Sequence, residues 1–414
     1  MTDDFTVAVY EEALHRAGAQ LVWHDCGWSD KVDECELLDT FFKLGPSWVG
    51  IRDEAVQSVV HTAAATMRYQ DADIPLQAVT GVTTGLHARR GGVAARTLAH
   101  AMAAGAANGA IVSALGIFDQ GFYDRLGYGS LDIMRLIRFD PRDIRVNATH
   151  RAPLRFSEKD VDDIHAARSR RWLRHGGICF ESAKRTLADM QECTNGIGFG
   201  YRDRPDGGIS HFLWFSRKDA ENGPFRVIFS AWETREQLCE LMAFLHSLAD
   251  QVHLVIMDEP PGIALQDFIQ RPLRSRSITQ KSKYETGITA MTYQQARIVN
   301  LPAAIDVIRT NGPSIEFNLV VKDPVTRFLP PDAPWSGCAG AYTIRIGETS
   351  TLSIGLTDGL DTLTADIGAF SRFWLGSRTA TALSVTADFH GPDALLRALD
   401  RCYCLTIPSF DWNF

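Results

Sequence analysis

The first part of the chain alternates between segments with the pattern of strands and one with the pattern of a helix. The β-branched segment 76–85 (LQAVTGVTTG) and the short apolar segment 110–116 (AIVSALG) each predict a strand. Between them, the Ala-rich segment 92–109, which ends in glycines, predicts a helix. The pattern therefore predicts an α/β strand–helix–strand unit whose first junction is rich in Gly and Arg.

Two further sections follow. Between about residues 155 and 290, helical patterns again alternate with apolar strand-like segments, which predicts a second α/β unit. After about residue 293, alternating strand patterns precede two helical ones, which is typical of a smaller α+β domain. The polar, basic, Pro-containing segment 139–160 suits a domain boundary. The predicted domains are residues 1–150, 151–292 and 293–414.

Composition agrees with several folded domains. A chain of 414 residues is too long for one ordinary core, and 45% hydrophobic with 22% charged residues is typical of globular proteins. The net charge of -8 argues against binding to nucleic acid, which needs a basic surface. It suits a cationic or amine ligand, although a mildly acidic balance also serves solubility alone.

Targeting and metal-binding patterns are missing from the sequence. The N-terminus carries acidic residues where a signal peptide needs basic ones, and no apolar run approaches the ~18 residues of a membrane span. The eight cysteines form no CxxC pair and no Cys/His spacing typical of zinc. We therefore expect a cytoplasmic protein with reduced thiols, no membrane contact and no metal.

The junction after the first predicted strand has the chemistry of an anion site. It reads VTTGLHARRGGVAARTL from Val82 to Leu98, so Arg89 and Arg90 stand beside glycines at the start of a helix. Backbone N–H groups and the helix dipole attract a phosphate there, and glycines allow close approach. A tight turn with two solvated arginines is the alternative. The glycine spacing of a dinucleotide-binding loop and the Gly-Lys-Ser/Thr end of a P-loop are both absent.

The segment 118–130 (FDQGFYDRLGYGS) gives this junction a context. Together, residues 77–130 resemble the acetyl-CoA-binding core of the GNAT N-acetyltransferases, with an Arg-x-x-Gly-x-Ala loop followed by a Tyr-containing helix. More closely, the chain resembles the Eis family, in which a GNAT domain precedes a second, degenerate GNAT domain and a sterol-carrier-protein-like domain. Further matching segments are ARIVNLPAAIDVI (296–308), VVKDP (320–324) and DIGAFSRFWLGSRTATAL (366–383). The resemblance implies tandem GNAT domains followed by that third domain.

The resemblance also implies which residues bind acetyl-CoA. A strand triplet would pair with the pantetheine arm, and the loop with the first helical turn would hold the pyrophosphate. Two further residues lie where the family usually has Ser and Glu in contact with the cofactor, and Phe118 departs from that pattern. The implied cofactor-binding residues are Val82, Thr83, Thr84, Arg89, Arg90, Gly91, Gly92, Val93, Ala94, Ala95, Phe118 and Asp119.

Two catalytic groups are implied in the same way. Tyr123 matches the family's general acid, since a phenol with a pKa near ~10 can protonate a departing thiolate. The terminal carboxylate of Phe414 matches the general base, held by the apolar segment CLTIPSFDWNF (404–414). An amine arrives as ammonium and must lose a proton before it attacks. The alternatives are that Tyr123 is a core aromatic and that the tail packs only for stability.

The acceptor pocket is expected near the early helical region and the chain end. Its candidate residues combine aromatic side chains with acids that would attract a cation, although aromatic residues at helical spacing are more often core. These candidates are Trp23, Asp25, Trp28, Glu36, Phe41 and Asp411, with Phe42 beside them. His24, His61, His87 and His100 stand at no position that the family pattern uses.

The implied function is acetyl transfer from acetyl-CoA to a primary amine by direct attack in a ternary complex. The resemblance implies a small cationic acceptor such as an aminoglycoside or a polyamine, and lysine side chains of peptides or proteins are an alternative. A non-catalytic acyl-CoA or lipid-binding protein is the alternative from another class. The resemblance also implies a homo-oligomer, commonly a hexamer, and residues 151–292 lack a second Arg-x-x-Gly-x-Gly/Ala loop, which favours a scaffold role.

Overall fold

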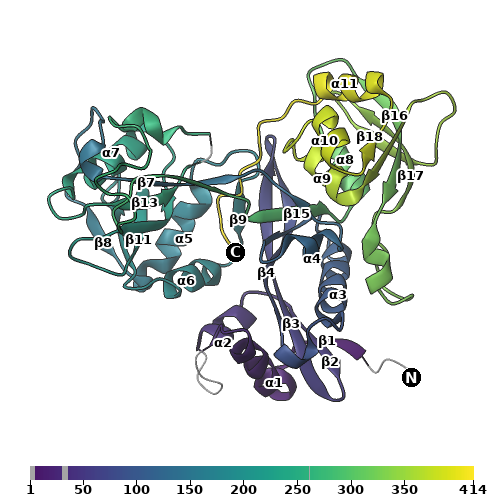
Figure 1. Ribbon diagram of the computed structural model, residues 1–414, viewed down its shortest axis with the longest axis horizontal. Helices are drawn as coiled ribbons and strands as arrows, with labels where there is room; N and C mark the ends of the chain where they lie inside the picture. Colours follow the sequence, from purple (N-terminus) through teal and green to yellow (C-terminus); the bar gives the residue numbers. More distant parts are fainter. Residues whose placement is uncertain (1–4, 30–35, 261) are drawn as a thin grey trace. The chain divides into compact units, whose positions relative to one another are not determined.

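The computed structural model describes residues 5–29, 36–260 and 262–414. The chain forms two compact units, and Figure 1 shows its elements in sequence colours. The first unit comprises Met1–Asp132, His175–Ile178 and Tyr293–Phe414, and the second comprises Ile133–Arg174 and Cys179–Thr292. The first unit therefore joins the N-terminal and C-terminal parts of the sequence.

The first unit contains an eight-stranded sheet in the order β1-β2-β3-β4-β5-β15-β6, with β9 paired to β3. Its strands are β1 (Phe5–Val9), β2 (Ser47–Arg52), β3 (Ala55–Tyr69), β4 (Ala72–Thr84), β5 (Val112–Gly116), β6 (Gly129–Ser130), β9 (Ile178–Phe180) and β15 (Gln294–Ile298). Strands β1 to β4 are antiparallel neighbours, whereas β4 and β5 run parallel. The strands predicted at 76–85 and 110–116 are confirmed by β4, which begins earlier and ends at Thr84, and by β5, which begins at Val112.

Helices cover both faces of this sheet. The elements are α1 (Glu12–Asp25), α2 (Glu36–Phe42), η1 (Leu86–Ala88), α3 (Val93–Ala107) and α4 (Gln120–Asp124). Helices α1 and α3 both pack on β3, and Figure 1 shows them on opposite sides of it. Residues 57–63 of β3 are all buried, as expected for a strand that is covered on both faces. The predicted Ala-rich helix is confirmed as α3.

The eight-stranded sheet of the first unit and the sheet of the second unit each contain one strand from a distant part of the sequence. Strand β7 (Met134–Phe139) follows β6 directly but pairs with β13 and β14 in the second unit. The place beside β5 is taken by β15, which pairs with both β5 and β6. Strand pairing thus crosses the predicted domain boundaries at 150 and 292. Such pairs can form because hydrogen bonds between strands do not require the strands to be close in sequence.

A five-stranded sheet in the order β18-β17-β16-β19-β20 completes the first unit. Its strands are β16 (Ile315–Lys322), β17 (Gly340–Ile346), β18 (Thr351–Ile354), β19 (Thr362–Asp366) and β20 (Phe389–His390). The accompanying helices are α8 (Leu301–Asp306), η5 (Pro324–Phe328), α9 (Ile367–Trp374), α10 (Ala380–Thr386) and α11 (Asp393–Cys402). This arrangement is α+β, as predicted for residues after 293.

The second unit has its own seven-stranded sheet in the order β14-β7-β13-β12-β11-β10-β8. Its other strands are β8 (Leu154–Phe156), β10 (Ile197–Tyr201), β11 (His211–Arg217), β12 (Phe225–Ala231), β13 (Val255–Asp258) and β14 (Gly287–Met291). Its helices are η2 (Pro141–Asp143), η3 (Glu158–Asp160), α5 (Val161–Arg170), α6 (Ala183–Gln191), α7 (Arg235–Ser247) and η4 (Leu265–Phe268). A capping box between Thr234 and Gln237 begins α7.

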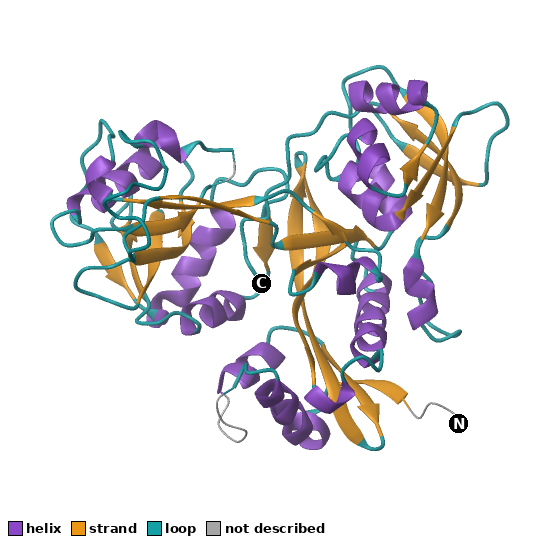
Figure 2. Cartoon of the chain, viewed as in Figure 1, coloured by secondary structure: helices purple, strands orange, loops and turns teal. Residues whose placement is uncertain are grey.

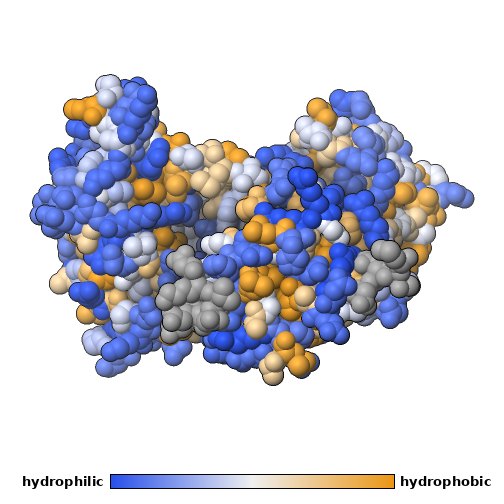
Figure 3. All heavy atoms as spheres, turned by 60° about the horizontal axis from the view of Figure 1, so that its bottom comes forward, coloured by the Kyte–Doolittle hydropathy of each residue, from blue (hydrophilic) through white to orange (hydrophobic). Residues whose placement is uncertain are grey.

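Both units are sheets with helices packed on them (Figure 2). Hydrophilic residues cover most of the face drawn in Figure 3, with hydrophobic residues in separate groups between them. Among the helices that the structure describes, none combines the length and the apolar character needed to cross a membrane.

Candidate active site

Strand β4 has an unpaired edge beside β5. The two strands pair only from Leu76 to Val79. A bulge at Thr80 then interrupts the pairing with β3, which resumes at Gly81 and continues to Thr84. The predicted triplet Val82, Thr83 and Thr84 therefore has a strand partner on one side and none on the other within the described residues. Such an edge offers backbone N–H and C=O groups to an extended ligand.

The loop from β4 to α3 is built for an anion. Arg90 and Gly92 both adopt the left-handed conformation, with φ of 64° and 75°, and Gly92 is the N-cap of α3. Among the described residues, no atom lies within 4 Å of where a Cβ on Gly92 would stand, so glycine is favoured here by the backbone conformation and not by a lack of space for a side chain. The first turn of α3 carries no acidic residue, which leaves the positive end of its dipole unopposed.

Basic side chains gather at this loop. Arg89 and Arg90 are exposed, as are Gly91 and Gly92. Arg52 at the end of β2 joins them, because its Nη1 lies 3.4 Å from where a Cβ on Gly91 would stand. Arg52 was not predicted from the sequence, since no local motif connects the end of β2 to the loop. Val93 and Ala95, also predicted to bind the cofactor, are buried in the first turn of α3, and Ala94 is half-buried.

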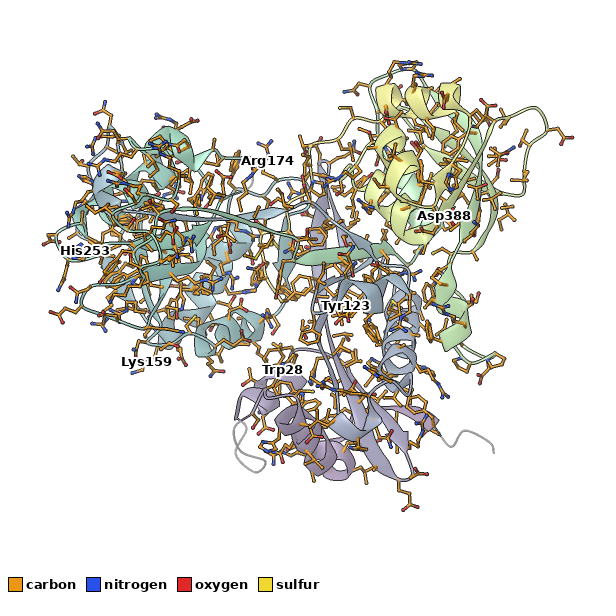
Figure 4. All side chains as sticks on the ribbon, viewed as in Figure 1. Trp28, Tyr123, Lys159, Arg174, His253 and Asp388 are labelled. Carbon is orange, nitrogen blue, oxygen red and sulfur yellow. The ribbon has the colours of Figure 1, made fainter. Side chains whose placement is uncertain are left out.

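Tyr123 lies in the core of the first unit. It is 5% exposed on the short helix α4, and Figure 4 shows it between β4 and α3. Burial, with smaller contributions from Asp119 and Tyr293, raises its pKa to about 12. The phenol therefore keeps its proton at neutral pH, as a general acid must. Asp119 caps α4, since its side chain accepts a hydrogen bond from Phe122 N at 3.2 Å.

The C-terminal tail is packed against the first unit. Phe410 and Trp412 are 2% and 1% exposed. Ser409 N donates to His175 O at 3.0 Å, and Gln294 Nε2 donates to Phe410 O at 3.0 Å. Asp411, predicted to lie in the acceptor pocket, accepts a hydrogen bond from Ile178 N at 3.1 Å, which helps to fix the tail.

The chain end reaches the end of β5. A Cβ on Gly116 would stand 2.9 Å from a terminal oxygen of Phe414 and 2.9 Å from the hydroxyl of Tyr293. Tyr293 also accepts a backbone hydrogen bond from Ile117 N at 2.6 Å. Tyr293, like Arg52, was not predicted from the sequence, because it precedes β15 and is far from the Tyr123 segment in sequence. The Tyr293 phenol and the terminal carboxylate thus lie at the end of β5, and Tyr293 is also one of the groups that raise the pKa of Tyr123.

The remaining predicted residues have varied environments. Trp23 is 1% exposed and contacts Trp28, Phe41 and His61 edge to face, so it belongs to a buried aromatic cluster. Trp28 is 46% exposed and lies near α2 in Figure 4. Asp25 Oδ2 accepts a hydrogen bond from Leu86 N at 3.0 Å.

Two predicted residues are not brought into these contacts. Phe118 is 94% exposed, so a contact with the cofactor stays a prediction. Glu36 begins α2, but its side chain lies outside the described residues. In the part of the chain that the structure describes, no group of three or more His, Cys, Asp or Glu side chains could hold a metal ion.

Solved structures share this architecture over the whole chain. A probable N-acyltransferase from Enterococcus faecalis V583 has a TM-score of 0.79 at 18% identity, over 99% of this chain and 100% of that one. A GCN5-related N-acetyltransferase from Kribbella flavida has a TM-score of 0.74 at 17% identity, over 100% and 99%. Eis1 from Mycobacterium abscessus has a TM-score of 0.74 at 16% identity, over 99% and 100%. Identities this low show a common fold.

Sequence comparison adds a family for one part of the chain. No curated protein gives a significant sequence match. Residues 19–131 match the family model of the acetyltransferase (GNAT) domain. This range contains the open edge of β4, the Gly/Arg loop and Tyr123. Residues 19–131 therefore form a GNAT acetyltransferase domain, and the chain is an acyltransferase.

Proposed function

We propose that the protein is an acetyl-CoA-dependent N-acetyltransferase that modifies a primary amine of a small cationic acceptor, such as an aminoglycoside-like or polyamine-like molecule. The amine attacks directly in a ternary complex. The observation that supports this most is the docked chain end, which lies at Gly116 in the same unit as Tyr123. In this proposal the chain end supplies a proton acceptor and Tyr123 supplies a proton donor within one unit.

The residues at the start of α3 fit acetyl-CoA. The backbone of Val82, Thr83 and Thr84 would pair with the pantetheine arm, and residues 90–95 would hold the pyrophosphate. The left-handed Gly92 and the arginines support this assignment, because together they aim N–H groups and positive charge at one place. Acetyl-CoA supplies the acetyl group as a thioester, in which the amine replaces the sulfur on the carbonyl carbon.

Tyr123 acts as the general acid. It donates its proton to the sulfur that leaves when the C–S bond breaks. Its pKa of about 12 exceeds that of an ordinary thiol, about 8.5, so the transfer is uphill for the isolated groups. Donation is still useful because Tyr123 stays protonated at any physiological pH. In this proposal its proton passes over a short distance to the sulfur as negative charge develops there.

The Phe414 carboxylate acts as the general base, directly or through water. It accepts the proton that the ammonium loses before the C–N bond forms. An α-carboxyl group has an ordinary pKa of about 3.3 to 3.7, so it is ionised near neutral pH and also attracts a cationic acceptor. The net charge of -8 agrees with such an acceptor.

The reaction is tested by measuring thiol release from acetyl-CoA with aminoglycosides, diamines and lysine peptides. We expect turnover with at least one small polyamine-like acceptor. Turnover with lysine peptides alone would show that the acceptor is a lysine side chain and not a small cationic molecule. No turnover with any amine, although CoA binds, would contradict the catalytic proposal.

The role of the chain end is tested by adding a few Gly and Ser residues after Phe414. The extension moves the carboxylate away, so we expect kcat to fall ~100-fold while acetyl-CoA still binds. The same residues added before Met1 form the matched control and should leave kcat unchanged. A folded C-terminal extension variant with full activity would show that the carboxylate is not the base.

We also propose that residues 293–414 form a sterol-carrier-protein-like domain that delivers the chain end, and that the protein is a homo-oligomer, hexameric as the resemblance in sequence implies. The tail contacts described above support the first part. Light scattering during size-exclusion chromatography measures the second: we expect six times the monomer mass, and a monomer would contradict it.

A further inference from the structure

A fully buried ion pair connects β15 with the end of β16. The side chains of Arg297 and Asp323 are both 0% exposed. Arg297 Nη2 donates to Asp323 Oδ2 at 2.6 Å, and Nη1 donates to Oδ1 at 3.2 Å, which makes the pair bidentate. A charge pair without solvent is unfavourable unless its geometry and remaining hydrogen bonds are satisfied.

The remaining hydrogen bonds of this pair are satisfied. Asp323 also accepts from Val325 N at 3.1 Å and from Cys338 N at 2.8 Å. Arg297 Nε donates to Ile298 O at 3.2 Å, and its guanidinium lies 5.2 Å from the ring centre of Trp335. The carboxylate is thus fixed by backbone groups on the chain after β16, and it fixes the guanidinium in turn.

The guanidinium reaches the segment that carries Tyr123. Arg297 Nη1 donates a hydrogen bond to Leu126 O. Leu126 N donates to Tyr123 O at 2.9 Å, and Tyr128 N donates to the same carbonyl at 3.3 Å. The buried guanidinium of Arg297 therefore holds the turn that ends α4. Moving Leu126 O would move Tyr123 with it.

Gly127 shows how closely the cation approaches this turn. Its φ is 81°, and a Cβ there would stand 2.7 Å from Arg297 Nη1. Any side chain at this position would collide with the guanidinium and strain the backbone. A second contact supports the same segment, since Gln295 Nε2 on β15 donates to Asp124 Oδ1 at 2.7 Å.

We propose that Arg297 and Asp323 are positioning residues for the general acid, through which the C-terminal part of the first unit sets the place of Tyr123. This inference rests on the proposed function of Tyr123. The pair touches no reacting atom, so its effect is on the orientation of the phenol. A displacement of about 1 Å in a catalytic group costs on the order of 100-fold in rate.

The test compares Asp323→Asn with a matched control, Asp189→Asn in the second unit. Arg168 Nη1 and Asp189 Oδ2 form a similarly buried pair at 2.7 Å, with side chains 4% and 8% exposed. Both variants should lose thermal stability. At a temperature where both are folded, we expect kcat to fall at least ~10-fold in Asp323→Asn only, with KM for acetyl-CoA within about twofold of the parent.

A double-mutant cycle with Tyr123→Phe separates positioning from a purely structural role. If the pair acts through the phenol, Asp323→Asn should cause little further loss of kcat once the phenol is gone. An equal fold loss in both backgrounds would overturn the proposal. Should Asp323→Asn fail to fold, Gly127→Ala takes its place, because its Cβ would meet Arg297 Nη1 at 2.7 Å, as well as Ile367 Cγ2 at 2.6 Å, without changing a charge.

A signal independent of turnover keeps this proposal distinct from the catalytic one. Tyrosine labelled with ¹³C gives a ring resonance for Tyr123, assigned by its loss in Tyr123→Phe. We expect this resonance to move in Asp323→Asn and to stay in place in Asp189→Asn. An unmoved resonance overturns the positioning role even if no amine is acetylated, whereas a moved resonance in an inactive protein contradicts only the proposed function.

Discussion

Gly116 is the residue at which the chain end, Tyr293 and the end of β5 meet. An added Cβ would stand 2.9 Å from both the Phe414 oxygen and the Tyr293 hydroxyl, and real Cβ atoms do not come that close. We therefore expect Gly116→Ala to displace the terminal carboxylate and lower kcat on the order of 10- to 100-fold. Steady-state kinetics with the best amine measures the effect.

Gly121→Ala is the matched control for this substitution. A Cβ on Gly121 would meet only Asp119 Oδ1 at 3.6 Å, which is an ordinary contact. The control should therefore keep its activity. Equal kcat in Gly116→Ala and in the parent would show that the chain end is not required at this place.

The pH dependence of the reaction reports on Tyr123. Its pKa is raised to about 12, so the phenol loses its proton only well above the ordinary range of a tyrosine. We expect kcat to show no descending limb from this group below about pH 11, and Tyr123→Phe to lower kcat ~10²- to 10⁴-fold. A limb near pH 9 that disappears in Tyr123→Phe would contradict the buried, protonated acid.

Single residues of the site were predictable only where a local motif carried them. Tyr123 and the loop 89–92 could be read from short segments that resemble a known pattern. Arg52, Tyr293 and Gly116 could not, because their roles depend on which distant segments meet in the fold. The tail was predicted to pack, but the amide of Ile178 as partner of Asp411 follows from tertiary structure alone.

Among the elements, the start of α3 has the clearest chemistry. Arg89 and Arg90 precede the 15-residue helix α3 in the loop, and Arg52 Nη1 from β2 lies 3.4 Å from where a Cβ on Gly91 would stand. We expect Arg52→Ala to raise KM for acetyl-CoA about 3- to 10-fold and to leave kcat unchanged, because it lies at the loop and not at Tyr123. The increase in KM should be smaller at high salt, because salt screens the attraction between Arg52 and the phosphates in the parent protein.

Arg397→Ala on α11 is the matched control for Arg52→Ala. Arg397 is an exposed arginine whose Nη2 pairs with Asp393 at 3.1 Å on the same helix. Its removal should change neither KM nor kcat. Titration of CoA by calorimetry checks the assignment directly, and equal affinity in Arg52→Ala and the parent would place the phosphates elsewhere.

Element types were predictable because they depend on local pattern. The Ala-rich run gave α3, and the β-branched run gave β4. Strand partners were not predictable in the same way. The hydrophobic pattern of residues 294–298 is compatible with any buried sheet position, and only the completed fold places β15 between β5 and β6.

At the scale of the whole molecule, buried neutral histidines link stability to pH. Burial lowers the pKa of His61 to about 3, and it is also the main cause of the lowered pKa values of His165, His175 and His211. The unfolded chain binds protons at these positions below about pH 6.5, while the folded chain does not. Their contribution to stability is therefore present above pH 6.5 and is lost as the pH falls.

We expect the melting temperature to fall steadily between about pH 7 and pH 5, measured by thermal unfolding in buffers of equal ionic strength. His24 is exposed, so His24→Gln should leave this slope unchanged. A melting temperature that is the same at both ends of the range would contradict the neutral, buried state of these imidazoles.

Strands β7 and β15 each pair with strands that are distant in sequence, and this affects synthesis of the protein on the ribosome. The edge of β5 stays exposed until residue 298 has left the exit tunnel, because β15 is the strand that pairs with β5 on that side in the described part of the chain. Meanwhile β7 must wait for β13 and β14. A nascent chain released after residue 150 would carry an open sheet and an orphaned strand, and we expect it to be held by chaperones or degraded.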